Sequence, residues 1–137
     1  MAKKARAFVL DAWAVMAYLE DEPAAERIAD IIADANDDGT PLLMTVVNLG
    51  EVWYIIAREA SEAEAERSVT EIRHLGIRIV DADWTLTREA AGFKARHKMS
   101  YADGFAAALA KQEKAQLVTG DREFACLEQD IQILWLR

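Results

Sequence analysis

The chain has 137 residues, of which 53% are hydrophobic, six are glycine and two are proline. A chain of this length and composition can bury a sizeable core, so we expect residues 1–137 to form a single domain. The formal net charge is −8, with 24 acidic and 16 basic residues. This balance argues against a surface that holds nucleic acid by charge alone, although a divalent metal ion can bridge two anionic molecules.

The cysteine content and the lengths of the apolar runs further restrict the class of protein. The single cysteine, Cys126, excludes an internal disulfide, and we expect it to be a buried thiol. No apolar run approaches the length of a membrane span, and Phe8–Leu10 is too short for the core of a signal peptide. We therefore expect a cytoplasmic protein without membrane association.

The apolar pattern predicts short strands that alternate with helices. In chain order, the strands are expected at residues 8–10, 41–44, 77–80, 117–119 and 131–135. The helices are expected at residues 12–20, 23–35, 46–57, 61–75, 84–98 and 100–110, with a short turn or helix around Phe124. Such alternation is typical of an α/β protein with a mostly parallel sheet that helices cover on both faces.

Two of the predicted strands end at an acidic residue. Asp11 follows Phe8–Leu10, and Asp121 follows Leu117–Thr119 after one glycine. Ligands of open α/β sheets bind at the carboxyl ends of the strands, so both acids are candidates for a functional site. The alternative for Asp121 is that it caps a following helix.

Two predicted helices each carry an isolated acid. Glu51 is the only charge in the helix at 46–57, and Asp103 is the only charge between Ser100 and Ala110. Burying an unpaired carboxylate is costly, so each acid either points to solvent or meets a cation. For Asp103, a capping box with Ser100 is a further alternative.

A site built from these four acids has only oxygen ligands, which favours Mg²⁺ or Mn²⁺ over zinc. Such an ion polarises a phosphodiester, activates water and neutralises charge on the leaving oxygen. A response-regulator receiver is one alternative, because it is a doubly wound domain of similar size with a magnesium site. A receiver, however, would have two adjacent acids after the first strand and a lysine near the last one.

Four short segments carry a family resemblance: Val9-Leu10-Asp11, Asn48-Leu49-Gly50-Glu51-Val52, Tyr101-Ala102-Asp103-Gly104 and Val118-Thr119-Gly120-Asp121. In this order they resemble the motifs of the PIN-domain superfamily, and more closely those of the VapC ribonuclease toxins from toxin–antitoxin pairs. The resemblance spans about Phe8 to Leu134. It implies a three-layer α/β/α sandwich in which the first strand is central and the fourth pairs beside it.

The resemblance also implies roles for individual residues. Asp11, Glu51, Asp103 and Asp121 would meet as ligands of Mg²⁺ or Mn²⁺, and Thr119 would support them by hydrogen bonding. The implied activity is endonucleolytic cleavage of RNA. The implied partners are a VapB-type antitoxin that plugs the site and a second copy of the chain. A PIN-like scaffold that binds partners without cutting RNA is the remaining alternative.

Two surfaces are candidates for contacts with these partners. Basic residues that would contact RNA are Lys94, Arg96, Lys98 and Arg122, although the first three also complement the dipole at the end of a helix. The first two predicted helices also carry more apolar surface than two short helices usually bury. Part of this surface would form a groove for the antitoxin, and its residues are Trp13, Met16, Tyr18 and Leu19, with Ile28, Ile31 and Ile32.

Overall fold

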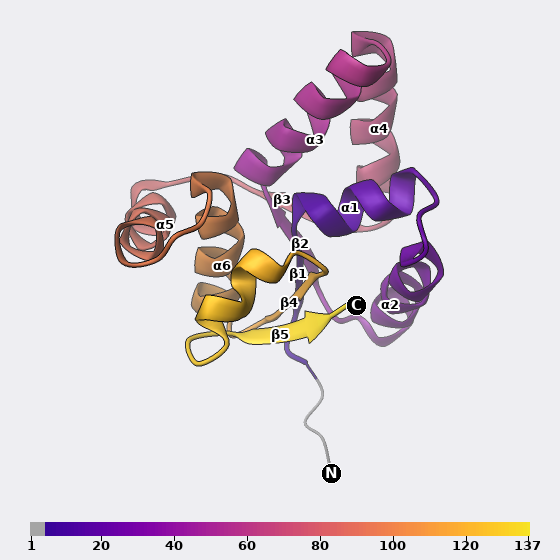
Figure 1. The fold of residues 1–137 in the computed structure, drawn as a ribbon. Coiled ribbons are helices and arrows are strands. Elements are labelled where there is room, and N and C mark those ends of the chain that lie inside the picture. Colours follow the sequence, from indigo (N-terminus) through magenta and orange to yellow (C-terminus); the bar gives the residue numbers. More distant parts are fainter. Residues whose placement is uncertain (1–4) are drawn as a thin grey trace.

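The computed structural model describes residues 5–137, which form a sheet of five parallel strands between layers of helices (Figure 1). The strands are β1 (Phe8–Leu10), β2 (Leu42–Thr45), β3 (Ile77–Val80), β4 (Gln116–Thr119) and β5 (Gln132–Trp135). The helices are α1 (Ala12–Leu19), α2 (Ala25–Asp38), α3 (Val46–Glu59), α4 (Glu62–His74), α5 (Trp84–Arg96) and α6 (Tyr101–Glu113), with a 3₁₀-helix η1 (Arg122–Leu127).

The strand order is β3-β2-β1-β4-β5, and every pairing is parallel. The predicted α/β sandwich, with the first strand central and the fourth beside it, is therefore confirmed. Because the chain leaves β1 toward β2 on one side and later adds β4 on the other, the strand order reverses between β1 and β4. The carboxyl ends of these two strands form the crevice where ligands of such sheets bind.

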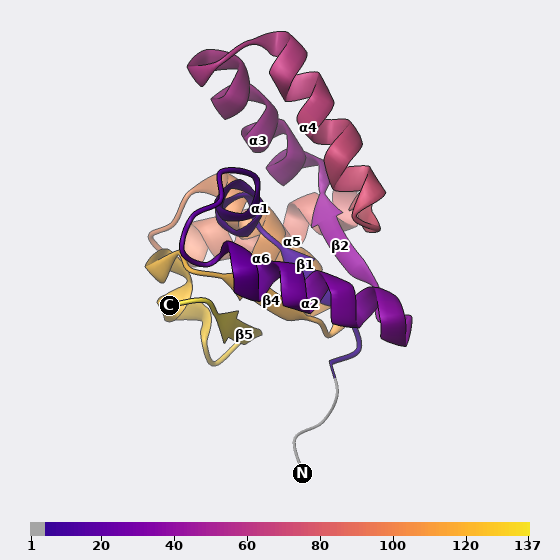
Figure 2. The same cartoon turned by 90° about the vertical axis from the view of Figure 1, so that its right-hand side faces the viewer.

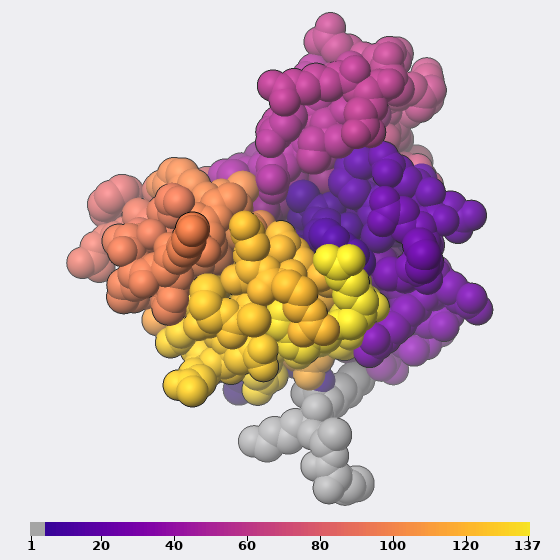
Figure 3. Space-filling model, in the orientation of Figure 1, coloured from indigo at the N-terminus to yellow at the C-terminus, as the bar shows by residue number. Residues whose placement is uncertain are grey.

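Side chains that alternate along the central strands fill two separate hydrophobic clusters, one on each face of the sheet. Val9 and Leu117 belong to the cluster beneath α5 and α6, whereas Leu10 and Val118 belong to the cluster with α1 and α2. Figures 1 and 2 show these helix pairs on opposite sides of the sheet, with the α3–α4 hairpin projecting beyond its edge. In the space-filling view, α1 lies between this hairpin above and the C-terminal segment below (Figure 3).

The ends of two helices differ from the sequence prediction. α5 ends at Arg96, two residues early, and His97 already has extended backbone. α6 continues to Glu113 and ends at Lys114, whose backbone is left-handed with φ of 51°. Residues 111–113, which lie beyond the predicted end of this helix at 110, form its exposed last turn, because lysine, glutamine and glutamate are good helix formers.

The expectation of a buried thiol at Cys126 is wrong, because this cysteine is exposed. It lies in η1, where three residues complete a turn. That period points Phe124 and Leu127 into the core and leaves Cys126 facing outward.

No helix among the described residues has the length and apolar character needed to span a membrane.

Candidate active site

Asp11 lies at the carboxyl end of β1 and is only 1% exposed. One carboxylate oxygen accepts a hydrogen bond from the Ala14 backbone N–H at 2.8 Å, which caps α1. The other oxygen accepts a hydrogen bond from the Thr119 hydroxyl at 2.5 Å. The Thr119 hydroxyl in turn accepts a bond from the Asp121 backbone N–H at 3.0 Å. A single hydroxyl on β4 therefore connects the two acids that follow the neighbouring strands.

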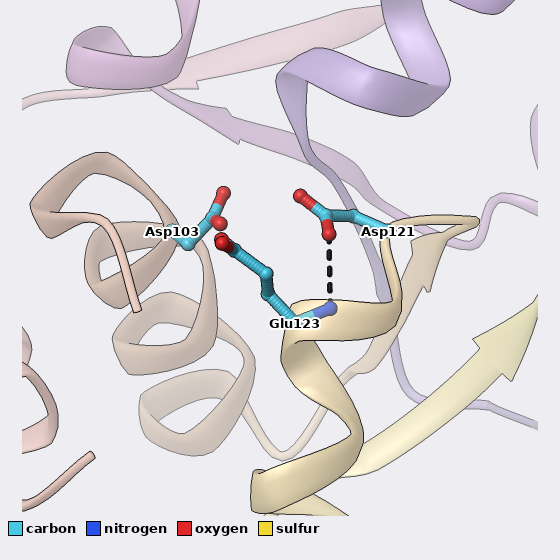
Figure 4. Close-up of side chains that lie close together, drawn as sticks. All are labelled: Asp103, Asp121 and Glu123. Atoms are coloured by element: carbon cyan, nitrogen blue, oxygen red, sulfur yellow. Dashed lines mark hydrogen bonds between the residues drawn. The ribbon is translucent and has the colours of Figure 1, made fainter. Parts of the chain in front are cut away.

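Asp103, Asp121 and Glu123 converge beside this pair (Figure 4). One carboxylate oxygen from each lies within 4.8 Å of the others. The Ser100 hydroxyl accepts a bond from the Asp103 backbone N–H at 3.1 Å and thereby caps α6. The cap is thus supplied by Ser100, while the Asp103 carboxylate faces Asp121 and Glu123. Asp121 has both roles, because its carboxylate also caps η1 by accepting a bond from the Glu123 backbone N–H at 2.9 Å.

Burial and the neighbouring acids make Asp11 and Asp103 reluctant to ionise. Burial raises the pKa of Asp11 to about 7, against the opposing effect of its bonds from Thr119 and Ala14. Burial also raises the pKa of Asp103 to about 8, assisted by a hydrogen bond with Glu123 and by the charge of Asp121. A cation at this point would remove the repulsion and release the protons.

Glu51 is half-buried on α3 and contacts the site from a third direction. Asn48, which is fully buried, donates one amide hydrogen bond to Glu51 at 3.3 Å and another to the Ala102 carbonyl at 3.0 Å. The Asn48 carbonyl oxygen accepts a bond from the Thr45 hydroxyl at 2.6 Å. Burial raises the pKa of Glu51, the bond from Asn48 lowers it, and the charge of Asp121 raises it again. Asn48 thus fixes Glu51 and joins α3 to α6.

The acids open into a cleft of about 340 Å³ between α1 and α3. Its acidic lining residues are Glu20, Glu22, Glu51, Glu59, Asp103 and Asp121, and its other lining residues are Ala12, Trp13, Met16 and Ile55. Within residues 5–137, no lysine or arginine lines it. The site therefore suits a cationic ligand.

The donor set fits Mg²⁺ or Mn²⁺, which prefer carboxylate oxygen at short distances. Oxygens bound to one such ion are at most about 4.2 Å apart, so the cluster formed by Asp103, Asp121 and Glu123 needs only a small contraction to share an ion.

A family model described as PIN domain matches residues 8–128 of the chain. The chain belongs to the PIN-domain family. The family resemblance seen in the four sequence segments is thereby confirmed. A sequence comparison with curated proteins gave no match.

Solved structures with this PIN fold include known toxins and toxin–antitoxin complexes. The DNA-bound VapBC of Salmonella typhimurium has a TM-score of 0.74 at 16% identity and covers 96% of this chain and 98% of its own. VapC20 of Mycobacterium tuberculosis, a toxin that cleaves the sarcin–ricin loop, has a TM-score of 0.71 at 14% identity. The match covers 88% of this chain and 94% of VapC20. PAE2754 of Pyrobaculum aerophilum has a TM-score of 0.68 at 19% identity, and the match covers 97% of this chain and 92% of PAE2754.

The receiver alternative is wrong. In the receiver strand order, 2-1-3-4-5, the first strand lies between the second and third, whereas β1 here pairs with β2 and β4. The buried Asp11 would also be inaccessible to a phosphodonor.

Sequence reasoning missed two residues of this PIN-domain site. Glu123 joins Asp103 and Asp121, and its signal was its place two residues after Asp121, in the first turn of η1. Asn48 lies three residues before Glu51 on the same helical face. Its signal was that it is a polar side chain among the apolar residues at the start of the predicted helix.

The basic residues expected to contact RNA lie outside the cleft lining: Lys94, Arg96, Lys98 and Arg122. The Lys94 ammonium donates a hydrogen bond to the Met99 carbonyl at 2.7 Å, which ties the end of α5 to the loop before α6. The Arg122 guanidinium lies 4.5 Å from the centre of the Trp135 ring.

Only part of the apolar surface expected to receive an antitoxin is accessible. Ile28 and Ile32 are buried in the core beneath α2 and are not available to a partner. Trp13 and Met16 are half-buried and line the cleft.

Proposed function

We propose that this PIN-domain protein is a metal-dependent endoribonuclease and the toxin of a toxin–antitoxin pair. The observation that carries the proposal is the convergence of Asp103, Asp121 and Glu123 beside the buried Asp11, at a cleft for which residues 5–137 supply no basic lining residue. VapC20 is a toxin that cleaves the sarcin–ricin loop, and toxin–antitoxin complexes recur among the other structures with this fold. We extend both properties to this chain as part of the proposal.

In this proposal, the acidic residues and Thr119 have different roles, which follow from their positions. Asp103, Asp121 and Glu123 would hold Mg²⁺ or Mn²⁺, with Glu51 and Asp11 adding negative charge from α3 and β1. The bound ion supplies charge stabilisation and an activated water for hydrolysis of an RNA phosphodiester. The Thr119 hydroxyl fixes the Asp11 carboxylate and the Asp121 backbone relative to each other.

RNA would approach from the rim of the cleft, because its phosphates are repelled from the acidic lining except where the ion bridges them. Lys94, Arg96, Lys98 and Arg122 are exposed and remain the proposed rim contacts. The proposed assembly is a cytoplasmic homodimer with a VapB-type antitoxin.

An RNA-cleavage assay with purified protein tests the proposal. We expect cleavage with Mg²⁺ or Mn²⁺, none in chelator, and a loss of about a hundredfold or more in Asp103→Asn, since a catalytic ion supplies several kcal/mol. The matched control is Asp81→Asn, which makes the same change at an exposed position outside the cleft. Full activity of Asp103→Asn would contradict catalysis at these acids. A complete absence of cleavage by the parent would favour the silent PIN-like scaffold.

A further inference from the structure

The segment that follows β5 lies along the loop that carries Asp121. The Leu136 backbone N–H donates a hydrogen bond to the Thr119 carbonyl at 2.9 Å, so the contact between β5 and β4 continues past the end of the paired strands. Figure 3 shows this C-terminal segment against α1. The next residue, Arg137, is exposed and lies beside the residues that lead into the metal-binding acids.

Two separate elements hold the Arg137 side chain. Its Nε–H donates a hydrogen bond to the Gly120 carbonyl at 2.8 Å, and its guanidinium lies over the Trp13 ring of α1, 5.3 Å from the ring centre. The Trp13 ring in turn packs on Gly120, where a Cβ atom would collide with it. Because Gly120 directly precedes Asp121 and Trp13 lines the cleft, these contacts place the guanidinium at the rim of the candidate active site.

Arg122 fixes the backbone of the same residue. Its guanidinium donates a hydrogen bond to the main-chain oxygen of Arg137 at 2.6 Å and lies 4.5 Å from the centre of the Trp135 ring. Arg122 directly follows Asp121 in the chain, whereas the Arg137 side chain is bonded to the residue directly before it. The backbone and the side chain of Arg137 are therefore both tied to the loop around Asp121.

These contacts order the Arg137 guanidinium without pairing it with an acidic side chain. An exposed arginine normally samples many rotamers, and fixing it for a ligand costs entropy, which the bonds to Gly120 and Trp13 have already removed. Among residues 5–137, the Arg137 side chain forms no ion pair with an acidic side chain, and its terminal nitrogens donate no hydrogen bond. The chain has 24 acidic residues, yet none of those described meets this guanidinium, so its fork of donors is open to an anion from outside.

We propose that Arg137 binds a phosphate of the RNA strand and thereby positions the strand beside the metal-binding acids. The inference rests on the proposed function, because the ligand is the RNA substrate. A guanidinium binds phosphate oxygens through two parallel hydrogen bonds, and the terminal nitrogens of Arg137 provide that pair of donors. The acidic lining repels each phosphate that the metal ion does not bridge. A fixed positive charge at the rim therefore determines along which side of the cleft the strand lies. Arg137 is a binding and positioning residue and takes no part in holding the ion.

The salt dependence of RNA binding tests this assignment. A short, fluorescently labelled single-stranded RNA is titrated with protein in chelator, and its dissociation constant is measured by anisotropy at several salt concentrations. Each phosphate contact to a single strand contributes about 0.7 to the slope of log affinity against log salt concentration. We expect Arg137→Gln to lower the magnitude of this slope by about 0.7 and to weaken binding about fivefold at low salt. Arg137→Lys should keep the slope, because it keeps the charge.

Arg73→Gln is the matched control, because it removes the same charge from an exposed position on α4 outside the cleft and should keep the slope of the parent. Calorimetry with Mn²⁺ separates a phosphate contact from a structural role. If Arg137 only supported Gly120 and Asp121, Arg137→Gln would lose Mn²⁺ affinity and leave the RNA slope unchanged. That result would overturn the inference, as would equal slopes for the parent and Arg137→Gln, an equal fall in Arg73→Gln, or undetectable binding of RNA by the parent.

The binding measurements in chelator do not depend on cleavage, so the two proposals can fail separately. A slope that falls in Arg137→Gln, together with a parent that never cleaves RNA, would refute the nuclease and keep the phosphate contact. Metal-dependent cleavage together with a slope that is unchanged in Arg137→Gln would refute only the phosphate contact.

Discussion

Replacing Asp103 by asparagine tests whether its carboxylate is held in an unfavourable environment. Burial, the bond with Glu123 and the charge of Asp121 raise its pKa from 3.8 to about 8. The folded chain therefore binds this proton more tightly than the unfolded chain does. The metal-free parent therefore gains stability as the pH falls from about 8 toward 3.8, and loses it as the pH rises through the same range.

The size of the effect follows from the two pKa values and from access of water. The full difference between 3.8 and about 8 would correspond to about 6 kcal/mol at high pH. The Asp103 carboxylate lines an open cleft and shares its proton with Glu123, so solvent and pairing should reduce this to about 1 kcal/mol.

Thermal melts of the parent and of Asp103→Asn in chelator measure this difference in stability. At pH 8.5, we expect the variant to melt about 3 °C higher, and this difference should shrink as the pH falls toward 3.8, where the unfolded parent is protonated as well. Asp81→Asn, which makes the same change at an exposed position, is the control and should melt with the parent. Excess Mn²⁺ should stabilise the parent by about 2.7 kcal/mol at a hundred times Kd, and the variant should lose most of that gain. A variant that melts lower at pH 8.5 and gains fully from Mn²⁺ would show that Asp103 only stabilises the start of α6.

Three further substitutions address the supports of the site. Thr119→Val keeps the side-chain shape but removes the bond to Asp11, so the unfolding free energy should fall by about 1–2 kcal/mol in denaturant titrations and Mn²⁺ affinity should fall in calorimetry. Asn48→Ala leaves a buried hydroxyl and a carbonyl without their partner and should cost about 2–3 kcal/mol in the same titrations, whereas a cost near zero would contradict the bonding role. A side chain at Gly120 would approach the Trp13 ring to 2.3 Å, so Gly120→Ala should lower the melting temperature, and adding Trp13→Leu should restore much of it.

The sequence predicted the parts of the site that depend on a single element. Asp11 and Asp121 were recognisable because each follows an apolar strand, and Glu51 and Asp103 because each is the lone charge of an apolar helix. These patterns reflect the cost of burying a carboxylate without a function. The positions of strands and helices followed from the apolar periodicity, whereas the placement of the first strand at the centre, beside the fourth, followed from the family resemblance.

The remaining features depend on contacts between elements. Glu123 resembles any acid in the first turn of a helix until η1 turns its carboxylate toward Asp103. Asn48 resembles a residue near a helix cap until α6 brings the Ala102 carbonyl to it. Similarly, Ile28 on α2 has the spacing of a free apolar stripe, and only the sheet beneath it shows that it is core.

Parallel titration of metal binding and RNA cleavage tests the central claim most directly. Mn²⁺ binding is followed by calorimetry, and the rate of cleavage is measured over the same concentrations, for the parent and for Glu123→Gln. Because Glu123 belongs to the group of acids that would hold the ion, occupancy and rate should rise with one midpoint in the parent and shift together to higher Mn²⁺ in the variant. Cleavage that persists at full rate in chelator, or a variant whose binding weakens while its cleavage midpoint stays fixed, would contradict a metal-dependent nuclease at these acids.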